Sequence, residues 1–206
     1  MLKIWGRRDS FNLQKALWCV VELGIAYERI DAGGRFGVTD TPQYLAMNPN
    51  GRVPTIDDDG FILWESNAII RYLAEKYGAG TLCAADPQGR ADAGRWMDWQ
   101  SATIGPNMRA LGIATYRTPP GQRDATVIAG LVGTASAHWA ILDRHLADRD
   151  YVTGAAFSIG DIPVGAYAWR WFSIDIERPE LPNLEAWYDR LKDREPFRTC
   201  VMLPLG

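Results

Sequence analysis

Two short motifs in the first third of the chain could together bind a small, negatively charged peptide. Residues 50–56 read Asn-Gly-Arg-Val-Pro-Thr-Ile, a tight turn followed by a strand that begins at a proline. A cis peptide bond before Pro54 would turn both backbone groups of Val53 outward, where an extended peptide can pair with them. Ser66, directly after Glu65, is a predicted helix N-cap, and the free N–H groups of that first turn would accept a carboxylate. Each motif alone is equally consistent with a plain edge strand or helix cap, but their spacing favours one composite binding site.

Composition excludes several classes of partner. The chain has 206 residues, of which 47% are hydrophobic and 23% charged, and its net charge is −3 from 22 basic and 25 acidic residues. Without a long basic run, neither nucleic acid nor an anionic membrane is an expected partner. No apolar stretch approaches the roughly 20 residues that span a bilayer, and the N-terminus is charged too early for a signal peptide. We therefore expect a cytoplasmic protein.

Cysteine and histidine patterns argue against a disulfide framework and against a metal site. Cys19, Cys83 and Cys200 are an odd number of cysteines with no CxxC spacing. His138 and His145 lie two helical turns apart, but no third ligand is evident. We expect reduced thiols and no bound metal.

The elements that must position the two motifs alternate between strand and helix up to residue 78. The intervening helix requires a crossover, so the first two strands should be parallel. The predicted order is βαβ and then ββα: a strand at 2–5, a helix ending at Gly24, a strand at 27–31, a helical turn at 41–45, a hairpin of 55–57 with 61–64, and a helix at 66–77.

Beyond residue 78 the pattern is helical. We place the first domain at 1–78, a linker at 79–86 and a second domain at 87–206. Gly105-Pro106 should kink the first long helix because proline removes a backbone hydrogen bond. Ser158 and Asp161 have capping-box spacing, which predicts a structural role in starting a central helix. The predicted helices cover residues 90–116, 122–146, 158–172 and 184–194.

Three stretches together resemble the cytosolic glutathione transferases: residues 48–54 (NPNGRVP), 64–73 (WESNAIIRYL) and 157–162 (FSIGDI). The resemblance covers essentially the whole chain. It implies an α/β thioredoxin-like N-terminal domain that binds glutathione and an all-α C-terminal helical bundle that lines the electrophile pocket. It also implies a homodimer.

The chemistry of that family needs a thiolate, and the loop at residues 7–12 is where donors to it should lie. Ser10 occupies a place similar to the activating serine of theta-like transferases. Asn12 also resembles the Nu-type bacterial enzymes that reduce disulfides with glutathione. The alternative is that Ser10 or Asn12 only caps the first helix. Unlike thioredoxins, the loop contains no cysteine, so the sulfur of bound glutathione would be the nucleophile.

The resemblance also assigns the parts of a glutathione site. Val53, before Pro54, should pair through its backbone with the cysteinyl part. Glu65 and Ser66 should hold the γ-glutamyl end. For the glycyl carboxylate Arg52 is the first choice, and Arg35 is the second, because its loop is similar to a glutathione-contacting loop in some bacterial relatives. Either arginine is otherwise a solvated surface charge.

The second substrate is much less defined. The resemblance places Met108, Arg109, Tyr116 and Phe172 at the pocket for a small hydrophobic electrophile or a disulfide. Three functions stay open: conjugation of glutathione to an electrophile, glutathione-dependent reduction of a disulfide or peroxide, and a non-catalytic binding or scaffold module. The intact Ser10, Val53 and Ser66 positions favour an enzyme.

Overall fold

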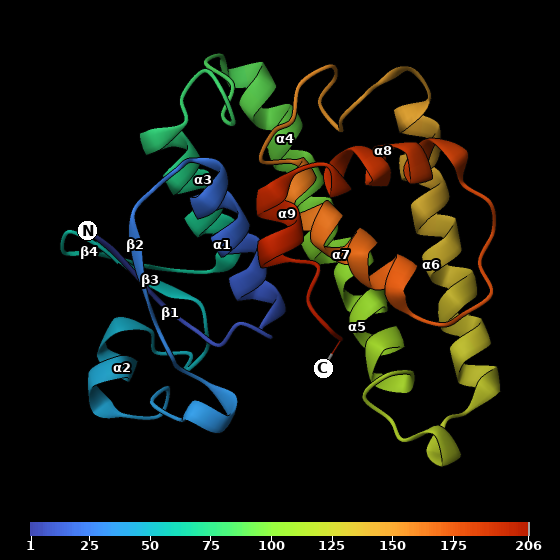
Figure 1. Cartoon of the computed structure of the whole chain (residues 1–206), viewed down its shortest axis with the longest axis horizontal. Helices are drawn as coiled ribbons and strands as arrows, with labels where there is room; N and C mark the ends of the chain where they lie inside the picture. Colours follow the sequence, from blue (N-terminus) through green and yellow to red (C-terminus); the bar gives the residue numbers. More distant parts are fainter. Residues whose placement is uncertain (206) are drawn as a thin grey trace.

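The computed structural model describes residues 1–205 and begins with a four-stranded mixed sheet (Figure 1). β1 (Leu2–Trp5) and β2 (Tyr27–Ile30) pair in parallel, as predicted from the helix α1 (Phe11–Glu22) between them. β3 (Thr55–Asp58) pairs antiparallel with both β1 and β4 (Phe61–Trp64), and the strand order is β2-β1-β3-β4. This is the thioredoxin-like arrangement that the resemblance implied.

Helices cover this sheet because its two central strands, β1 and β3, carry apolar side chains that are fully buried, Ile4 and Ile56. α3 (Ser66–Tyr77) packs against α1, and both helices contribute fully buried residues to the core around Ile4 and Ile56. η1 (Gly34–Phe36) and α2 (Pro42–Met47) lie between β2 and β3 in the chain, and α2 is separated from α1 and α3 in the fold (Figure 1).

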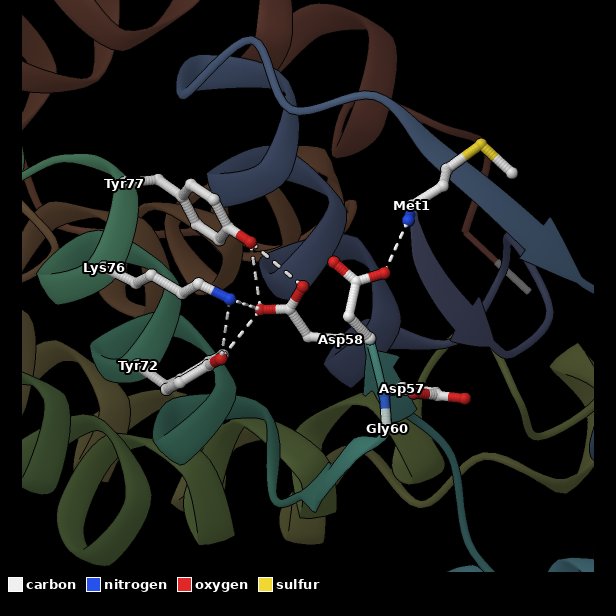
Figure 2. Close-up of polar contacts among 8 residues, drawn as sticks. Met1, Asp57, Asp58, Gly60, Tyr72, Lys76 and Tyr77 are labelled. Atoms are coloured by element: carbon white, nitrogen blue, oxygen red, sulfur yellow. Dashed lines mark hydrogen bonds and ion pairs between the residues drawn. The ribbon is translucent and has the colours of Figure 1, made fainter.

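A buried carboxylate ties α3 to the end of β3 (Figure 2). Asp58 accepts hydrogen bonds from the hydroxyls of Tyr72 (2.7 Å) and Tyr77 (2.9 Å) and from Lys76 Nζ (2.7 Å). Burial alone would raise the pKa of Asp58, but these hydrogen bonds together hold it below its ordinary value. The cluster fixes the C-terminal half of α3 relative to the sheet, and so helps to fix where α3 begins.

The β3–β4 hairpin turns at Asp59-Gly60, as the sequence predicts. Both residues have positive φ, 53° and 95°, which is the conformation that a two-residue hairpin turn needs. Gly60 N–H donates to the Asp57 carboxylate (2.7 Å), and the Met1 ammonium donates to Asp59 (2.8 Å; Figure 2). The turn therefore also holds the N-terminus of the chain.

The remainder is helical, and each predicted helix begins two or three residues from its predicted start. Two further differences concern the elements themselves. The helix predicted over 90–116 contains a wide π-turn directly before Gly105-Pro106, where proline has no N–H to give to a regular turn. The helix predicted over 184–194 ends at Lys192, and a further short helix, which the sequence analysis did not predict, begins at Glu195. The elements are α4 (Pro87–Trp99), η2 (Gln100–Ile104), α5 (Gly105–Ala114), η3 (Pro120–Gln122), α6 (Ala125–His145), η4 (Leu146–Asp148), α7 (Asp161–Ser173), α8 (Pro182–Lys192) and α9 (Glu195–Cys200). The linker proposed at 79–86 falls between α3 and α4, and the domain bounds stay a prediction.

Helix α6 corrects one expectation about hydropathy. Ala125–Asp148 is the one helix in the described chain that is long and apolar enough to cross a membrane by length and composition, whereas the sequence analysis found no such stretch. Ala135, Trp139 and Leu142 on this helix are fully buried, and α6 packs against α5 and α8.

The predicted capping pair of the second half is confirmed in one of its two contacts. Ser158 N–H donates to the Asp161 carboxylate (2.9 Å), but Ser158 Oγ accepts from Gly160 N–H (3.2 Å) and not from Asp161 N–H. The N-cap of α7 is Gly160, so the helix predicted from residue 158 begins at Asp161. Asp161 also accepts from Val152 N–H and Trp187 Nε1, both at 2.9 Å. Its carboxyl is fully buried, and burial raises its pKa to about 6. The motif therefore joins the loop before α7, the start of α7 and helix α8.

A buried lysine connects the two halves of the molecule. Lys15 on α1 donates to Asn67 Oδ1 of α3 (3.0 Å) and to Gln100 Oε1 of the π-turn (3.2 Å). Asn67 in turn donates to the carbonyl of Met97 on α4 (3.0 Å). Burial lowers the pKa of Lys15 to about 7, although Glu65 opposes that shift. One ammonium on α1 thus satisfies acceptors on two other elements, α3 and the π-turn.

We expect Asp161→Asn to destabilise the protein. An amide nitrogen would face hydrogen-bond donors that the carboxylate now accepts, so the free energy of unfolding should fall by about 2–4 kcal/mol. Urea denaturation measures this loss. Asp148→Asn is the matched control, because the Asp148 side chain is 74% exposed, and it should change stability by less than about 0.5 kcal/mol. Equal midpoints for the two variants would contradict the structural role of Asp161.

Lys15→Met should change how stability depends on pH. The folded-state pKa of Lys15, about 7, lies below the unfolded value, so the unfolded chain binds more protons between the two values and stability from this site rises with pH. The free energy of unfolding of the wild type should therefore rise by about 3 kcal/mol relative to that of Lys15→Met between about pH 7 and about pH 9.5. Denaturation of both proteins across that range measures the difference. A difference that does not vary with pH would show that Lys15 keeps an ordinary pKa.

Candidate functional site

An open cavity of about 640 Å³ lies between the sheet half and the helical half. One wall comes from the loop before α1, from α1 itself and from the start of α3, and the other comes from α5, its following turn and α7. The cavity brings together most of the predicted site residues: Ser10, Asn12, Arg52, Glu65, Ser66, Met108, Arg109 and Tyr116.

Ser10 is the N-cap of α1. Its backbone is extended (φ −74°, ψ 117°), and its Oγ accepts the N–H of Leu13 at 3.5 Å. Only 8% of the residue is exposed. Within residues 1–205 its own O–H has no acceptor, so the hydroxyl can cap the helix with a lone pair and still donate its hydrogen to a group in the cavity. The two roles considered for Ser10 are therefore compatible.

Asn12 links the N-termini of α1 and α3. The hydroxyl of Ser66 donates to Asn12 Oδ1 at 3.3 Å, across 54 positions of sequence. Both helices begin at this point, so their positive ends face the same cavity. The contact places the candidate thiolate donors of the first loop beside the candidate anion site of α3.

The structure corrects the N-cap assignment of Ser66. Glu65 holds the N-cap position with φ 71° and ψ 111°, and Ser66 is the first helical residue. A positive φ in a residue other than glycine costs about 1 kcal/mol or more. This backbone conformation leaves the Ser66 hydroxyl free of capping, and the hydroxyl instead reaches Asn12. A sequence pattern for an N-cap does not contain the backbone angles that decide this.

The Val53-Pro54 peptide bond is cis, the case for which the sequence analysis stated a consequence without predicting it. Neither residue is among the described residues that line the cavity. The preceding carbonyl, that of Arg52, is held by Tyr44 OH (2.6 Å) and Asn48 Nδ2 (2.8 Å). No hydrogen bond within residues 1–205 uses the N–H or C=O of Val53. These two groups are available to pair with an extended peptide.

Two predicted residues lie elsewhere. Arg35 is exposed in η1, its guanidinium lies 4.8 Å from the ring of Phe36, and it does not line the cavity. Phe172, near the end of α7, stacks on Tyr188 of α8 with ring centroids 4.5 Å apart and is likewise outside the cavity. The C-terminal part of α7 faces α8, which turns Phe172 away from the site.

The sequence analysis missed an aromatic and cationic cluster at the cavity. Phe11 contacts the ring of Tyr167 (4.0 Å between centroids), the guanidinium of Arg170 (4.5 Å) and the ammonium of Lys15 (5.1 Å). Phe11 and Lys15 have the i, i+4 spacing of one helix face, which is a usable signal. Arg170 carried no such signal, because only the packing of α7 on α1 brings it there.

Positive charge dominates the lining. Among the described residues that line the cavity, Asp9 and Glu65 are the acidic ones, and Asp9 pairs with Arg7 at 3.1 Å. The arrangement of donors, helix N-termini and cations stabilises an anion such as a thiolate or a carboxylate. The basic members are Arg7, Lys15, Arg52, Arg109, Arg117 and Arg170.

The chain's own cysteines are poorly suited to act as the nucleophile here. Cys19, Cys83 and Cys200 are all buried, and burial raises the pKa of each thiol.

His145, one of the two histidines considered as metal ligands, has its Nε2 2.8 Å from the carbonyl of Val152. The described residues contain no group of three or more His, Cys, Asp or Glu side chains that could hold a metal ion.

Comparisons with known proteins match both halves of the chain to the same family. A family model described as the N-terminal domain of glutathione S-transferase matches residues 1–75, and one described as the C-terminal domain matches residues 125–190. The chain is 40% identical to glutathione S-transferase GstB of Escherichia coli over 208 residues, covering 100% of both. It is 29% identical to glutathione S-transferase hmp2 of Hypomyces subiculosus, covering 96% of both.

Among solved structures, the chain is similar to the theta class glutathione S-transferase from Xanthomonas axonopodis pv. citri with glutathione bound. The TM-score is 0.94 at 47% identity, and the match covers 100% of this chain and 99% of that one. The family models and the full-length relative together cover the sheet half, the helical half and the cavity between them. The chain belongs to the glutathione S-transferase family and is an enzyme of that family.

Proposed function

We propose that the cavity binds glutathione and holds its thiol as a thiolate, which attacks a small electrophile. The observation that carries this proposal is the convergence of Ser10, Asn12 and Ser66, from two helix N-termini, on one positively lined cavity. The similar Xanthomonas enzyme is described with glutathione bound, which supports the same ligand here.

In this proposal each end of the tripeptide meets a group suited to it. The unpaired N–H and C=O of Val53 pair with the cysteinyl residue as an added strand would. The first turn of α3, with Ser66 and Glu65, receives the γ-glutamyl carboxylate and ammonium. Arg52 neutralises the glycyl carboxylate.

Thiolate formation needs a modest stabilisation. A free thiol has a pKa of about 8.5, and each unit of lowering corresponds to about 1.4 kcal/mol in favour of the anion. The Ser10 O–H, the N-terminus of α1 and the nearby cations each favour the anion. Sulfur then forms a bond to the electrophilic carbon, the leaving group departs with its electron pair, and the thiol proton goes to solvent.

Reduction of a disulfide or peroxide is a second candidate, because Asn12 lines the cavity two residues after Ser10. With a disulfide, the first glutathione displaces a thiolate, and a second glutathione then attacks the mixed disulfide and displaces the other thiolate. With a peroxide, the first glutathione takes up an oxygen as a sulfenic acid and releases an alcohol, and a second glutathione displaces water from it to give glutathione disulfide. A non-catalytic scaffold would show no thiol-dependent turnover.

We further propose a metal-free, cytoplasmic homodimer with a role in detoxification, which rests on the family. A monomer by light scattering would count against the dimer.

Ser10→Ala should lower kcat/KM for glutathione with chlorodinitrobenzene by about 10-fold to 100-fold, since one donor to the sulfur anion is lost. The thiolate absorbance of bound glutathione, followed against pH, should show a raised thiol pKa. Ser136→Ala on α6 is the control, because its hydroxyl donates only to Val132 O (2.8 Å) and lies outside the cavity. Full activity in both Ser10→Ala and Asn12→Ala would refute the proposed activation. Assaying glutathione disulfide formation in parallel separates conjugation from reduction.

Arg52→Gln should weaken glutathione binding by about 10-fold because the glycyl carboxylate loses a charged partner. Arg35→Gln is the matched control, since Arg35 is also an exposed arginine of the same half but does not line the cavity. Calorimetric titration with glutathione measures both. If only Arg35→Gln weakened binding, the glycyl end would lie along η1 instead. No binding by the folded wild type would remove the basis of the proposed function.

A further inference from the structure

The helical wall of the cavity has a charge pattern that glutathione alone does not explain. From residue 100 onward the lining includes Arg109, Arg117 and Arg170, and within the described chain it includes no Asp or Glu. In the proposed binding mode both carboxylates of glutathione are held on the other wall, by Arg52 and the start of α3. The helical wall therefore carries an excess of positive charge where the second substrate would lie.

Arg170 is the most informative member of this wall. It is 8% exposed, and its guanidinium donates to two neutral acceptors, Gln14 Oε1 (3.1 Å) and Ala166 O (3.4 Å). None of the ion pairs formed within residues 1–205 includes Arg170 or Arg109. Burial lowers the pKa of Arg170, and the neighbouring Tyr116 and Tyr167 oppose that shift. A buried cation in this state is stabilised by any anion that enters the cavity.

Packing also places this charge on the ring of Phe11, beside the proposed thiolate donor Ser10 in sequence. The Arg170 guanidinium lies 4.5 Å from the ring of Phe11, and Phe11 directly follows Ser10. The ring of Tyr167 lies 4.0 Å from the same Phe11 ring. Arg109, on α5, lines the same wall and is exposed to solvent. A small molecule between Ser10 and α7 would thus meet aromatic faces and guanidinium groups together.

We propose that the second substrate is a small electrophile that carries a carboxylate, which Arg170 and Arg109 receive. The inference rests on the proposed function and specifies its substrate class. It replaces the expectation of a purely hydrophobic electrophile. For a halide substrate the thiolate sulfur forms the new C–S bond, the C–halogen bond breaks, and halide leaves with the electron pair. The carboxylate is not consumed, and no other reactant is needed.

A matched pair of substrates tests this inference. One is a chloronitrobenzoate with chlorine para to the carboxylate and ortho to the nitro group, and the other is the corresponding neutral benzamide. Each enzymatic kcat/KM is divided by the rate constant of the uncatalysed reaction with glutathione, which removes the difference in intrinsic reactivity. We expect wild type to favour the carboxylate by about 10-fold or more. Equal or better use of the amide would overturn the inference.

Variants then locate the recognition. Arg109→Gln and Arg170→Gln should each reduce the carboxylate preference, which is the ratio of the two corrected kcat/KM values, several-fold, because KM for the benzoate rises more than KM for the benzamide. Arg123→Gln, outside the cavity, is the control and should keep the preference. If Arg170→Gln does not fold, the exposed Arg109→Gln still decides. A rise in the glutathione KM with both substrates would show instead that the arginines serve glutathione.

The two levels of the argument fail in different ways. Loss of the proposed function would appear as no calorimetric binding of glutathione and no turnover of either substrate. Failure of the substrate inference would appear as intact glutathione binding and intact turnover with no preference for the carboxylate. Intact binding, a preference for the carboxylate and its loss in the Arg109 and Arg170 variants would support both.

Discussion

The burial of helix α1 is the constraint on which the rest of the structure depends. Every residue from Leu13 to Val20 is buried, because α3 covers one side of the helix and α7 and α9 cover another. Gly165 of α7 lies so close that an added Cβ would stand 3.0 Å from the Trp18 ring. A polar residue on such a helix must be satisfied inside, and Lys15 meets this need through Asn67 and Gln100. The same bonds align the two walls of the cavity, so packing and site geometry have one cause.

The site itself relies on helix N-termini and not on a reactive side chain of the chain. α1 and α3 both begin at the cavity, and the bond between Ser66 and Asn12 keeps their first turns together. Unsatisfied N–H groups and hydroxyl donors stabilise a negative charge that a ligand brings. The buried cysteines have the opposite environment, since desolvation raises their pKa values. A protein built in this way can activate a bound thiol while its own thiols stay protonated.

Much of the fold could be predicted because its signals are local. The Asp59-Gly60 turn, the parallel pairing of β1 with β2 and the contact of Ser158 with Asp161 each follow from residues near one another in sequence. The failures were places where distant atoms decide. The φ of 71° at Glu65 displaced the N-cap, and the packing of α7 on α8 turned Phe172 away from the site. The roles of the individual site residues remain predictions, although most of those residues line one cavity.

The sequence by itself determined most of the element types and the motifs around Val53 and Ser66, and its resemblance to a known family implied the thioredoxin-like class of the first half. Periodicity and turn residues are properties of a few neighbouring positions, so no tertiary information is needed for them. Only the tertiary structure decided the character of the second wall. Arg170 reaches Gln14 across 156 positions of the chain, and its charge matters because burial removes water from around it. Burial and distance between far segments are set by packing, and packing is not visible in any short stretch of sequence.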